Sequence, residues 1–260
     1  MHLTLEELIN HEIAYFAFVA AVERTPIAWF LNGPTLPEYH DANRALHLRD
    51  DGRGAEAVTQ EVIAYFRSRG LPVVADLDAM AEAQGIGFAL RRRGITPVMG
   101  DRVLLRYAHT TPPVLRPSSV EVQTVPNAPE SEALATWIDL SVSDSANEPD
   151  AALWRAVAEQ EARFPLCRLY LGLLEGRPAG ACDLFSAEGW GRIEMVATHP
   201  AMRRRGVASA VVTHALTDSL AEGNQVTYLF TESNSEAERL YIHLGFERWG
   251  MNVLWRHLER

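Results

Sequence analysis

A short basic stretch in the second half of the chain has the residue types of an anion-binding turn. The apolar run 193–197 predicts a strand, and His199-Pro200 ends it, because proline removes a backbone donor and disfavours helix in the residue before it. Arg203-Arg204-Arg205-Gly206-Val207-Ala208 follows and opens a helix that we expect to reach about Ala221. The first turn of a helix has unpaired N–H groups and a positive dipole end. Because glycine has no Cβ, a ligand can approach the backbone at Gly206. The stretch therefore predicts a phosphate site, with pyrophosphate as the natural guest.

A second stretch, from Asn234 to Phe246, could bring a titratable side chain to the same place. It reads Asn-Ser-Glu-Ala-Glu-Arg-Leu-Tyr-Ile-His-Leu-Gly-Phe and follows an apolar run that ends near Thr231. Asparagine is a common helix cap and glycine a common helix stop. We therefore expect Asn234 to cap a helix over 235–244 and Gly245 to end it.

Together the two stretches resemble motifs A and B of the GNAT superfamily of N-acetyltransferases. Motif A wraps the pyrophosphate of coenzyme A with the pattern Arg/Gln-x-x-Gly-x-Gly/Ala, which Arg203, Gly206 and Ala208 fill here. Motif B is Asn-x-x-Ala-x-x-Leu-Tyr-x-x-x-Gly-Phe, and every fixed position is filled. The resemblance covers about 120–260, where the predicted elements follow the GNAT order. It implies an α/β fold with a mixed central β-sheet flanked by helices, and acetyl-CoA as co-substrate.

The resemblance also implies which residues hold the coenzyme. They lie on the predicted strand, the turn, the helix start and the second motif: Val196, Ala197, Thr198, Arg203, Arg204, Arg205, Gly206, Val207, Ala208, Ser209 and Asn234. In the family the strand bulges and splays from its neighbour at this point. The N–H of Val196 is then expected to polarise the thioester carbonyl, and Ala197 and Thr198 to bond the pantetheine arm through their main chain.

Tyr241 fills the tyrosine position of motif B, which the resemblance implies is the general acid. When an amine attacks a thioester, the leaving thiolate needs a proton, and a tyrosine near the sulfur can supply it. In the alternative interpretation Tyr241 only packs on the coenzyme, because positioning alone can support turnover. We expect direct attack by the bound amine, since no activated nucleophile is visible in the sequence.

Two carboxylates compete for the role of general base. Glu194 lies two residues before Val196 and could deprotonate an ammonium directly or through water, or it could be a surface carboxylate. Glu232, after the next strand, is its rival. No His/Cys/carboxylate spacing predicts a metal site. Cys167 and Cys182 lie on the strands of a predicted hairpin and are expected to line the core or a pocket.

Composition limits the wider function. The chain has 260 residues, is 47% hydrophobic and 22% charged, and carries a net charge of −10, which is typical of a soluble globular protein. An acidic surface argues against nucleic-acid binding. No signal segment and no bilayer-spanning apolar run are visible, so we expect a cytoplasmic protein without a membrane partner. We expect a small-molecule amine as acceptor, and the chain could be a monomer or a homodimer.

Residues 1–113 carry a weaker copy of the same pattern. Helices are predicted over 3–23, 54–69 and 79–92, and strands over 44–47, 72–76 and 103–107; the proline-rich segment 109–119 is the predicted linker. Arg53-Gly54-Ala55 echoes Arg205-Gly206-Val207, but the chemistry is missing. Asp51, Glu56 and Leu90 stand where Arg203, Ala208 and Tyr241 stand in the second half.

We therefore predict a degenerate GNAT-like domain over 1–113 and a catalytic N-acetyltransferase domain over 114–260. An unrelated α/β cap is the alternative for the first half. For the whole chain, the alternative is a catalytically silent CoA-binding or regulatory module. The acceptor stays open among small amines, amino acids, antibiotics and protein termini, because the fold does not set the substrate.

Overall fold

The computed structural model describes residues 4–97, 102–114, 119–143 and 149–256. By their contacts the residues form two units, Met1–Val103 with Gly250–Arg260, and Leu104–Trp249. The predicted linker 109–119 falls within the second unit, and its residues 115–118 lie outside the described part of the chain.

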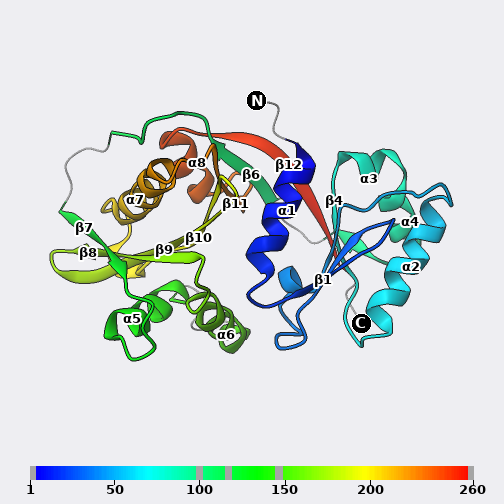
Figure 1. The fold of residues 1–260 in the computed structure, drawn as a ribbon, viewed down its shortest axis with the longest axis horizontal. Helices are drawn as coiled ribbons and strands as arrows, with labels where there is room; N and C mark the ends of the chain where they lie inside the picture. The colour runs from blue at the N-terminus through cyan, green and yellow to red at the C-terminus, as the bar shows by residue number, and fades with distance from the viewer. Residues whose placement is uncertain (1–3, 98–101, 115–118, 144–148, 257–260) are drawn as a thin grey trace. The chain divides into compact units, whose positions relative to one another are not determined.

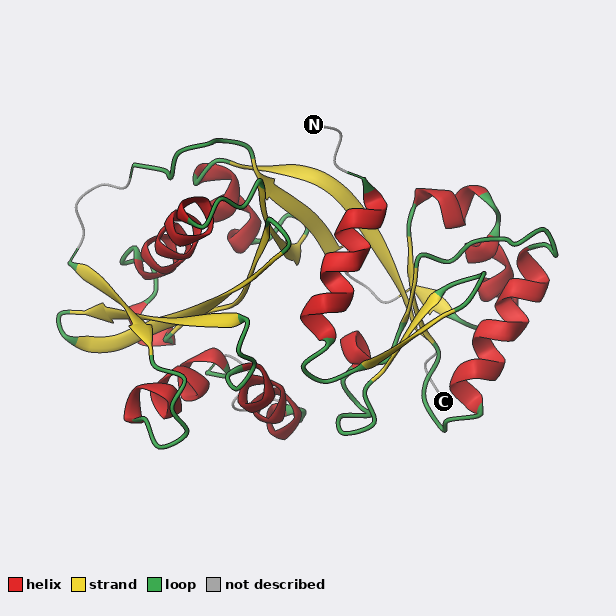
Figure 2. Cartoon of the chain, viewed as in Figure 1, coloured by secondary structure: helices red, strands yellow, loops and turns green. Residues whose placement is uncertain are grey.

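The second unit is built on a mixed sheet (Figure 1). Its strands are β7 (Val120–Val125), β8 (Cys167–Leu174), β9 (Arg177–Ala187), β10 (Trp190–Thr198) and β11 (Val226–Glu232). They lie in this order, antiparallel from β7 to β10, with β11 parallel to β10. Helices flank both faces of this sheet, as Figure 2 shows. Helices α5 (Glu132–Ser141) and α6 (Ala151–Glu161) lie on one side, and α7 (Val207–Ala221) and α8 (Glu236–His243) on the other. The predicted α/β fold is confirmed.

Strand β6 (Arg102–Tyr107) is next to β11 in the sheet order. The sequence predicted this strand, but as the last element of the first half of the chain. From Leu104 onward it belongs to the second unit instead. Linear order could not show this, because strand neighbours in a sheet need not be neighbours in sequence.

Two glycines allow α7 to lie close to the sheet. A Cβ added at Gly180 on β9 would lie 2.5 Å from Cγ1 of Val207, and one added at Gly172 on β8 would lie 2.9 Å from Cγ1 of Val211. Both distances are too short for real atoms, so larger residues would push the helix outward. The two glycines therefore help to fix where α7 begins.

Strands β10 and β11 separate near the middle of β10. Their pairing ends at Arg192 with Tyr228, although both strands continue. On the other edge of β10 the register to β9 shifts between Glu194 and Ala197, which marks a bulge. Met195 within this bulge has a φ of 51°. The splay and the bulge that the family resemblance implied are thus confirmed.

The first unit has its own sheet and core. Its strands are β1 (Ala21–Arg24), β2 (Trp29–Asn32), β3 (Ala45–Leu46), β4 (Val74–Leu77), β5 (Thr96–Pro97) and the end of β12 (Phe246–Arg256). Its helices are α1 (Leu5–Phe16), α2 (Ala55–Arg67), α3 (Ala79–Ala83) and α4 (Ile86–Arg92), with a 3-10 turn η1 (His40–Ala42). Buried Phe30, Val62, Phe66 and Leu90 belong to one core cluster.

Two helices of the first unit differ from the prediction. The helix predicted over 3–23 ends at Phe16, and Ala21–Arg24 instead forms a strand that pairs with β2. The helix predicted over 79–92 is broken at Gly85, whose φ of 74° is left-handed and ends α3 before α4 begins. Thr4 caps α1, because its side chain accepts from the Glu7 N–H in a capping box.

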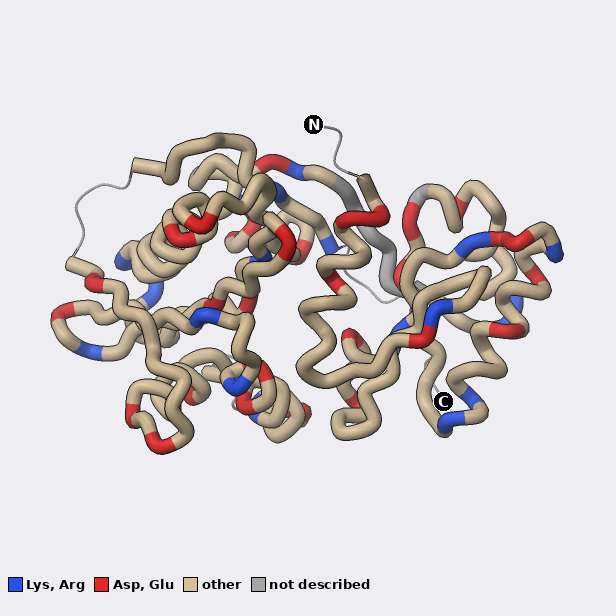
Figure 3. The backbone as a smooth tube through the Cα atoms, viewed as in Figure 1, with Lys and Arg blue, Asp and Glu red and all other residues tan. Residues whose placement is uncertain are grey.

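Acidic and basic residues are mixed along the backbone of each unit (Figure 3). Among the described helices, none has the length and apolar character that a membrane crossing requires.

Candidate active site

A cavity of about 690 Å³ lies in the second unit, between the turn before α7 and one side of α8. It is lined by the end of β10, the turn, the first residues of α7 and α8: Val196, Thr198, Arg203, Arg204, Gly206, Val207, Ala208, Ser209, Glu236, Ala237, Arg239, Leu240, Tyr241 and His243. Most of the predicted coenzyme residues are therefore brought together. Ala197, Arg205 and Asn234 are not among the lining residues.

The start of α7 presents backbone donors to this cavity. Gly206 precedes the helix with a left-handed φ of 83°, and no side chain caps the helix there. By contrast, Ser131 and Ser235 cap α5 and α8 through their hydroxyl groups. Because Gly206 to Ser209 line the cavity, the unpaired N–H groups and positive dipole end of α7 are available to an anion.

The arginines of the turn differ in their partners. Arg204 forms an ion pair with Glu236 on α8 at 3.3 Å, and Arg205 forms one with Glu175, outside the cavity. Arg203 lines the cavity beside them and is exposed. The basic side of the cavity thus rests on Arg203, Arg204 and the helix start.

The cap of α8 is Ser235 rather than Asn234, so the predicted cap is wrong. Ser235 Oγ accepts from the Glu238 N–H at 3.0 Å. Asn234 has a φ of 61° and donates its own N–H to Glu238 Oε2 at 2.7 Å. Asparagine tolerates the left-handed region, which leaves the extended cap position to the next residue. The predicted stop at Gly245 is confirmed, with a φ of 96° after α8.

Tyr241 is 6% exposed, and its ring meets Phe246 edge-on at 6.0 Å between centroids. Burial raises the pKa of Tyr241 above its usual value, and the charges of Glu194 and Cys182 raise it further. The phenol therefore keeps its proton at neutral pH. A general acid needs this protonation state.

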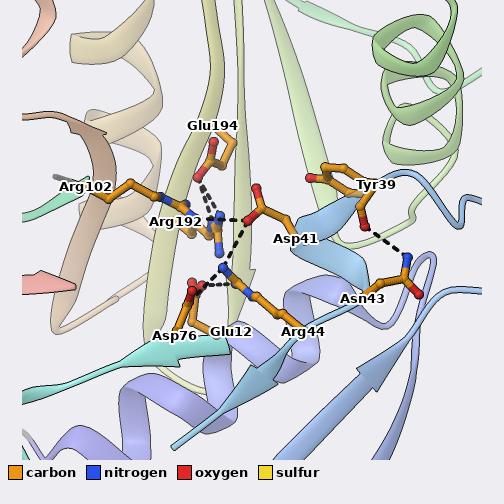
Figure 4. Close-up of polar contacts among 9 residues, drawn as sticks. All are labelled: Glu12, Tyr39, Asp41, Asn43, Arg44, Asp76, Arg102, Arg192 and Glu194. Atoms are coloured by element: carbon orange, nitrogen blue, oxygen red, sulfur yellow. Dashed lines mark hydrogen bonds and ion pairs between the residues drawn. The ribbon is translucent and has the colours of Figure 1, made fainter. Parts of the chain in front are cut away.

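Glu194 lies directly across from Asp183 on β9, just before the bulge. Directly opposite residues of antiparallel strands point to the same face of the sheet. Glu194 therefore lies on the same face as Asp183, a question that the sequence left open. Arg192 Nε and Nη2 both donate to Oε1 of Glu194, at 2.9 and 2.6 Å (Figure 4). Glu194 does not line the cavity; its rival Glu232 does not line it either and is exposed at the end of β11.

The fold also gathers a cluster that the sequence did not predict. Ligand atoms of Glu161, Cys167 and Asp183, all buried, lie within 4.8 Å of one another, as in groups that can hold a metal ion. Helix α6 supplies the first and strands β8 and β9 the others, so no sequence spacing revealed them. Burial raises the pKa of Asp183 well above its usual range, and Glu161 and Glu194 raise it further. Protonation would remove the cost of burying a charge.

The corresponding turn of the first unit is already occupied by a carboxylate. Oδ1 of Asp50 accepts from the N–H groups of Gly52 and Gly54 at 2.9 and 2.8 Å, just before α2. Arg53 pairs with Asp51 and Glu61 at 2.8 and 2.7 Å. Donors that could face a phosphate are thus used within the protein itself, which supports the prediction of a degenerate first half.

A buried arginine also marks the first unit. Arg44 is 1% exposed and pairs with Glu12, Asp41 and Asp76 at 3.4, 3.1 and 2.9 Å (Figure 4). Burial raises the pKa of Asp76, while Arg44 lowers it. Around Arg44 the carboxylates thus compensate a buried charge.

Comparison with known proteins places the fold. The model of the FR47-like protein family matches residues 170–255. A mycothiol acetyltransferase of Thermobispora bispora is 28% identical over 152 residues, which cover 54% of this chain and 50% of that protein. The chain thus spans about half the length of the curated relative it matches.

Two solved structures share the architecture. A GCN5-related N-acetyltransferase from Kribbella flavida has a TM-score of 0.71 at 17% identity, covering 98% of this chain and 95% of its own. A tandem GNAT protein from the clavulanic acid biosynthesis pathway has a TM-score of 0.59 at 14% identity, covering 93% and 80%. At these identities the likeness concerns the fold alone.

Proposed function

We propose that the chain is a GNAT-type N-acetyltransferase and that it transfers an acetyl group from acetyl-CoA to a primary amine of a small molecule. One observation carries the proposal. An uncapped helix start at Gly206 and the buried, protonated Tyr241 line the same cavity. Acetyl-CoA has a pyrophosphate that could bind at the helix start and a thioester that could react beside Tyr241.

The donors around the cavity fit the coenzyme. The N–H groups at the start of α7, with Arg203 and Arg204, would hold the pyrophosphate. Beyond Arg192, β10 has no pairing with β11 among the described residues. The main chain of Val196, Ala197 and Thr198 would there bind the thioester carbonyl and the pantetheine arm.

In the proposed reaction the amine nitrogen attacks the acetyl carbon, and the N–H of Val196 stabilises the oxyanion. The carbon–sulfur bond then breaks, and Tyr241 donates its proton to the leaving thiolate. Glu194 takes the proton that the amine loses. Its Oε1 is held by Arg192, while its Oε2 makes no hydrogen bond within the described part of the chain and can act as the base.

The remaining assignments stay predictions. We propose that Asn234, whose side chain is exposed and donates to Ser233 Oγ at 3.2 Å, reaches the coenzyme arm as the family resemblance implies. The domain roles, the cytoplasmic location and the choice between monomer and homodimer also stay as the sequence predicted them.

Calorimetric titration of acetyl-CoA tests the proposal directly. We expect the wild type to bind one equivalent and Gly206→Glu to bind none, because the added carboxylate would repel the pyrophosphate. An amine screen that follows release of the coenzyme thiol then identifies the acceptor. No binding to the wild type would overturn the proposal. Binding without turnover of any amine would support the silent CoA-binding module, and two equivalents would contradict a degenerate first half.

A further inference from the structure

We propose that Arg239 and His243 on α8 form a second anion subsite, which binds the 3′-phosphate of the coenzyme. The protein would then distinguish acetyl-CoA from acetyl-dephospho-CoA, which lacks this phosphate. The inference rests on the proposed function, since it concerns the same cavity. It adds a specificity determinant that the phosphate turn does not supply.

The cavity has basic side chains beyond those of the phosphate turn. Its charged and imidazole side chains are Arg203, Arg204, Arg239, His243 and Glu236. Glu236 is paired with Arg204. On α8, Arg239 and His243 are therefore the lining side chains that remain to bind an anion, in addition to the donors of the turn.

Within the described ranges of the chain, Arg239 forms no ion pair with a carboxylate. Its guanidinium carries five N–H donors, and Nη1 donates to the Asn234 carbonyl oxygen at 2.9 Å. This acceptor is neutral. Hydrogen bonds from Arg248 lower the pKa of Glu238, and the charge of Arg239 contributes less to this shift. Both oxygens of Glu238 are bound to Arg248, at 2.5 and 2.9 Å. Arg239 is thus exposed and lines an anion cavity with unused donors, whereas Arg204, Arg205 and Arg248 each pair with a glutamate.

The spacing of the two residues suits a single phosphate group. Arg239 and His243 are four residues apart on α8, so their side chains are neighbours on one helix face. Both line the cavity. Arginine binds phosphate oxygens with two parallel N–H groups, and an imidazole N–H can donate a third bond. The pyrophosphate would thus bind at the turn and the 3′-phosphate at α8.

Titration with acetyl-CoA and with acetyl-dephospho-CoA at one fixed salt concentration tests this subsite. We expect the wild type to bind acetyl-dephospho-CoA about tenfold or more weakly, as the loss of charge-assisted hydrogen bonds predicts. Arg239→Gln should weaken acetyl-CoA binding by about tenfold and leave acetyl-dephospho-CoA binding unchanged. The ratio of the two affinities would then approach one. His243→Gln should shift the ratio in the same direction by less.

The matched control is Arg177→Gln, which removes the same charge from an exposed site outside the cavity. It should leave the ratio at the wild-type value. Equal affinity of the wild type for both ligands would overturn the inference, and so would an equal weakening of both ligands by Arg239→Gln. In both of these outcomes the wild-type protein still binds acetyl-CoA. They are therefore distinct from a failure of the proposed function, in which the wild type binds neither ligand.

Discussion

Arg204, in the turn before α7, forms an ion pair with Glu236 on the first turn of α8, at 3.3 Å between Nη2 and Oε1. Both side chains are mostly exposed, at 85% and 78%. An exposed pair of this kind contributes about 0–1 kcal/mol to stability. Its larger effect is electrostatic, because it places a negative charge in a cavity that we propose for phosphates.

Glu236→Gln should therefore tighten acetyl-CoA binding by about twofold to fivefold, since it removes that charge and releases Arg204 for the pyrophosphate. Calorimetry at low salt measures the effect, which should shrink at high salt. Glu247→Gln, at an exposed position of β12 outside the cavity, is the control and should change little. Weaker binding by Glu236→Gln would show that Glu236 supports the coenzyme site.

Tyr241→Phe should lower kcat by about 100-fold or more while the Kd for acetyl-CoA stays unchanged. The hydroxyl is lost, but the buried ring and its contact with Phe246 remain. Because the pKa of Tyr241 is raised, the wild-type rate should not fall through loss of this proton between pH 7 and about pH 10. Steady-state rates with the acceptor found in the amine screen measure both effects. A variant that keeps full activity would mean that Tyr241 only packs on the coenzyme.

Asp183→Asn tests the buried cluster of Glu161, Cys167 and Asp183. The raised pKa means that the folded protein holds a proton on Asp183 that the unfolded chain loses above about pH 4. The native state then binds more protons, so wild-type stability should fall as pH rises through the raised pKa, by up to about 1.4 kcal/mol per pH unit. Asparagine stays neutral, and the variant should lack this decline.

Urea unfolding of both proteins at pH 5 and pH 8 measures the difference. The advantage of Asp183→Asn over the wild type should grow with pH. A wild type that becomes more stable when zinc is added, with no such gain in the variant, would instead indicate that the cluster binds a cation.

Ser235→Ala should lower the free energy of unfolding by about 1 kcal/mol, because the Oγ bond to the Glu238 N–H is lost. Asn234→Gly keeps a residue that accepts the positive φ and should leave stability nearly unchanged. Thermal unfolding compares the two variants. A larger loss of stability in Asn234→Gly than in Ser235→Ala would mean that Asn234 caps the helix. Separately, the effect of Asn234→Gly on the Kd for acetyl-CoA tests the proposed contact with the coenzyme arm.

The second half of the chain was the more predictable part. Its elements alternate clearly between apolar strands and helices, and in the turn at Arg203 to Gly206 the glycine stands directly before the helix that it was predicted to open. Cys167 and Cys182 lie on the paired antiparallel strands β8 and β9, which confirms the predicted hairpin. These features are local, so the sequence contains the information that places them.

Other features depend on contacts that no short stretch encodes. The helix predicted over 3–23 ends early because Ala21–Arg24 pairs with β2, and this pairing replaces helical bonds. The side of Glu194 depends on the register before the bulge. Asp183 and Glu161 meet because the end of α6 lies beside Cys167 of β8 and Asp183 of β9, so their shared burial could not be predicted from spacing.

Strand β12 begins in the second unit and continues into the first, and this has a consequence for synthesis on the ribosome. Val253 to Arg256 pair with Leu77 to Val74 on β4, so the sheet of the first unit lacks this strand until those distant residues have been translated. During most of its synthesis the nascent first unit therefore has an open β4 edge, although its own helices and core have already emerged. A chaperone that shields strand edges would act in this interval, and a chain that stops before β12 would leave that edge exposed permanently.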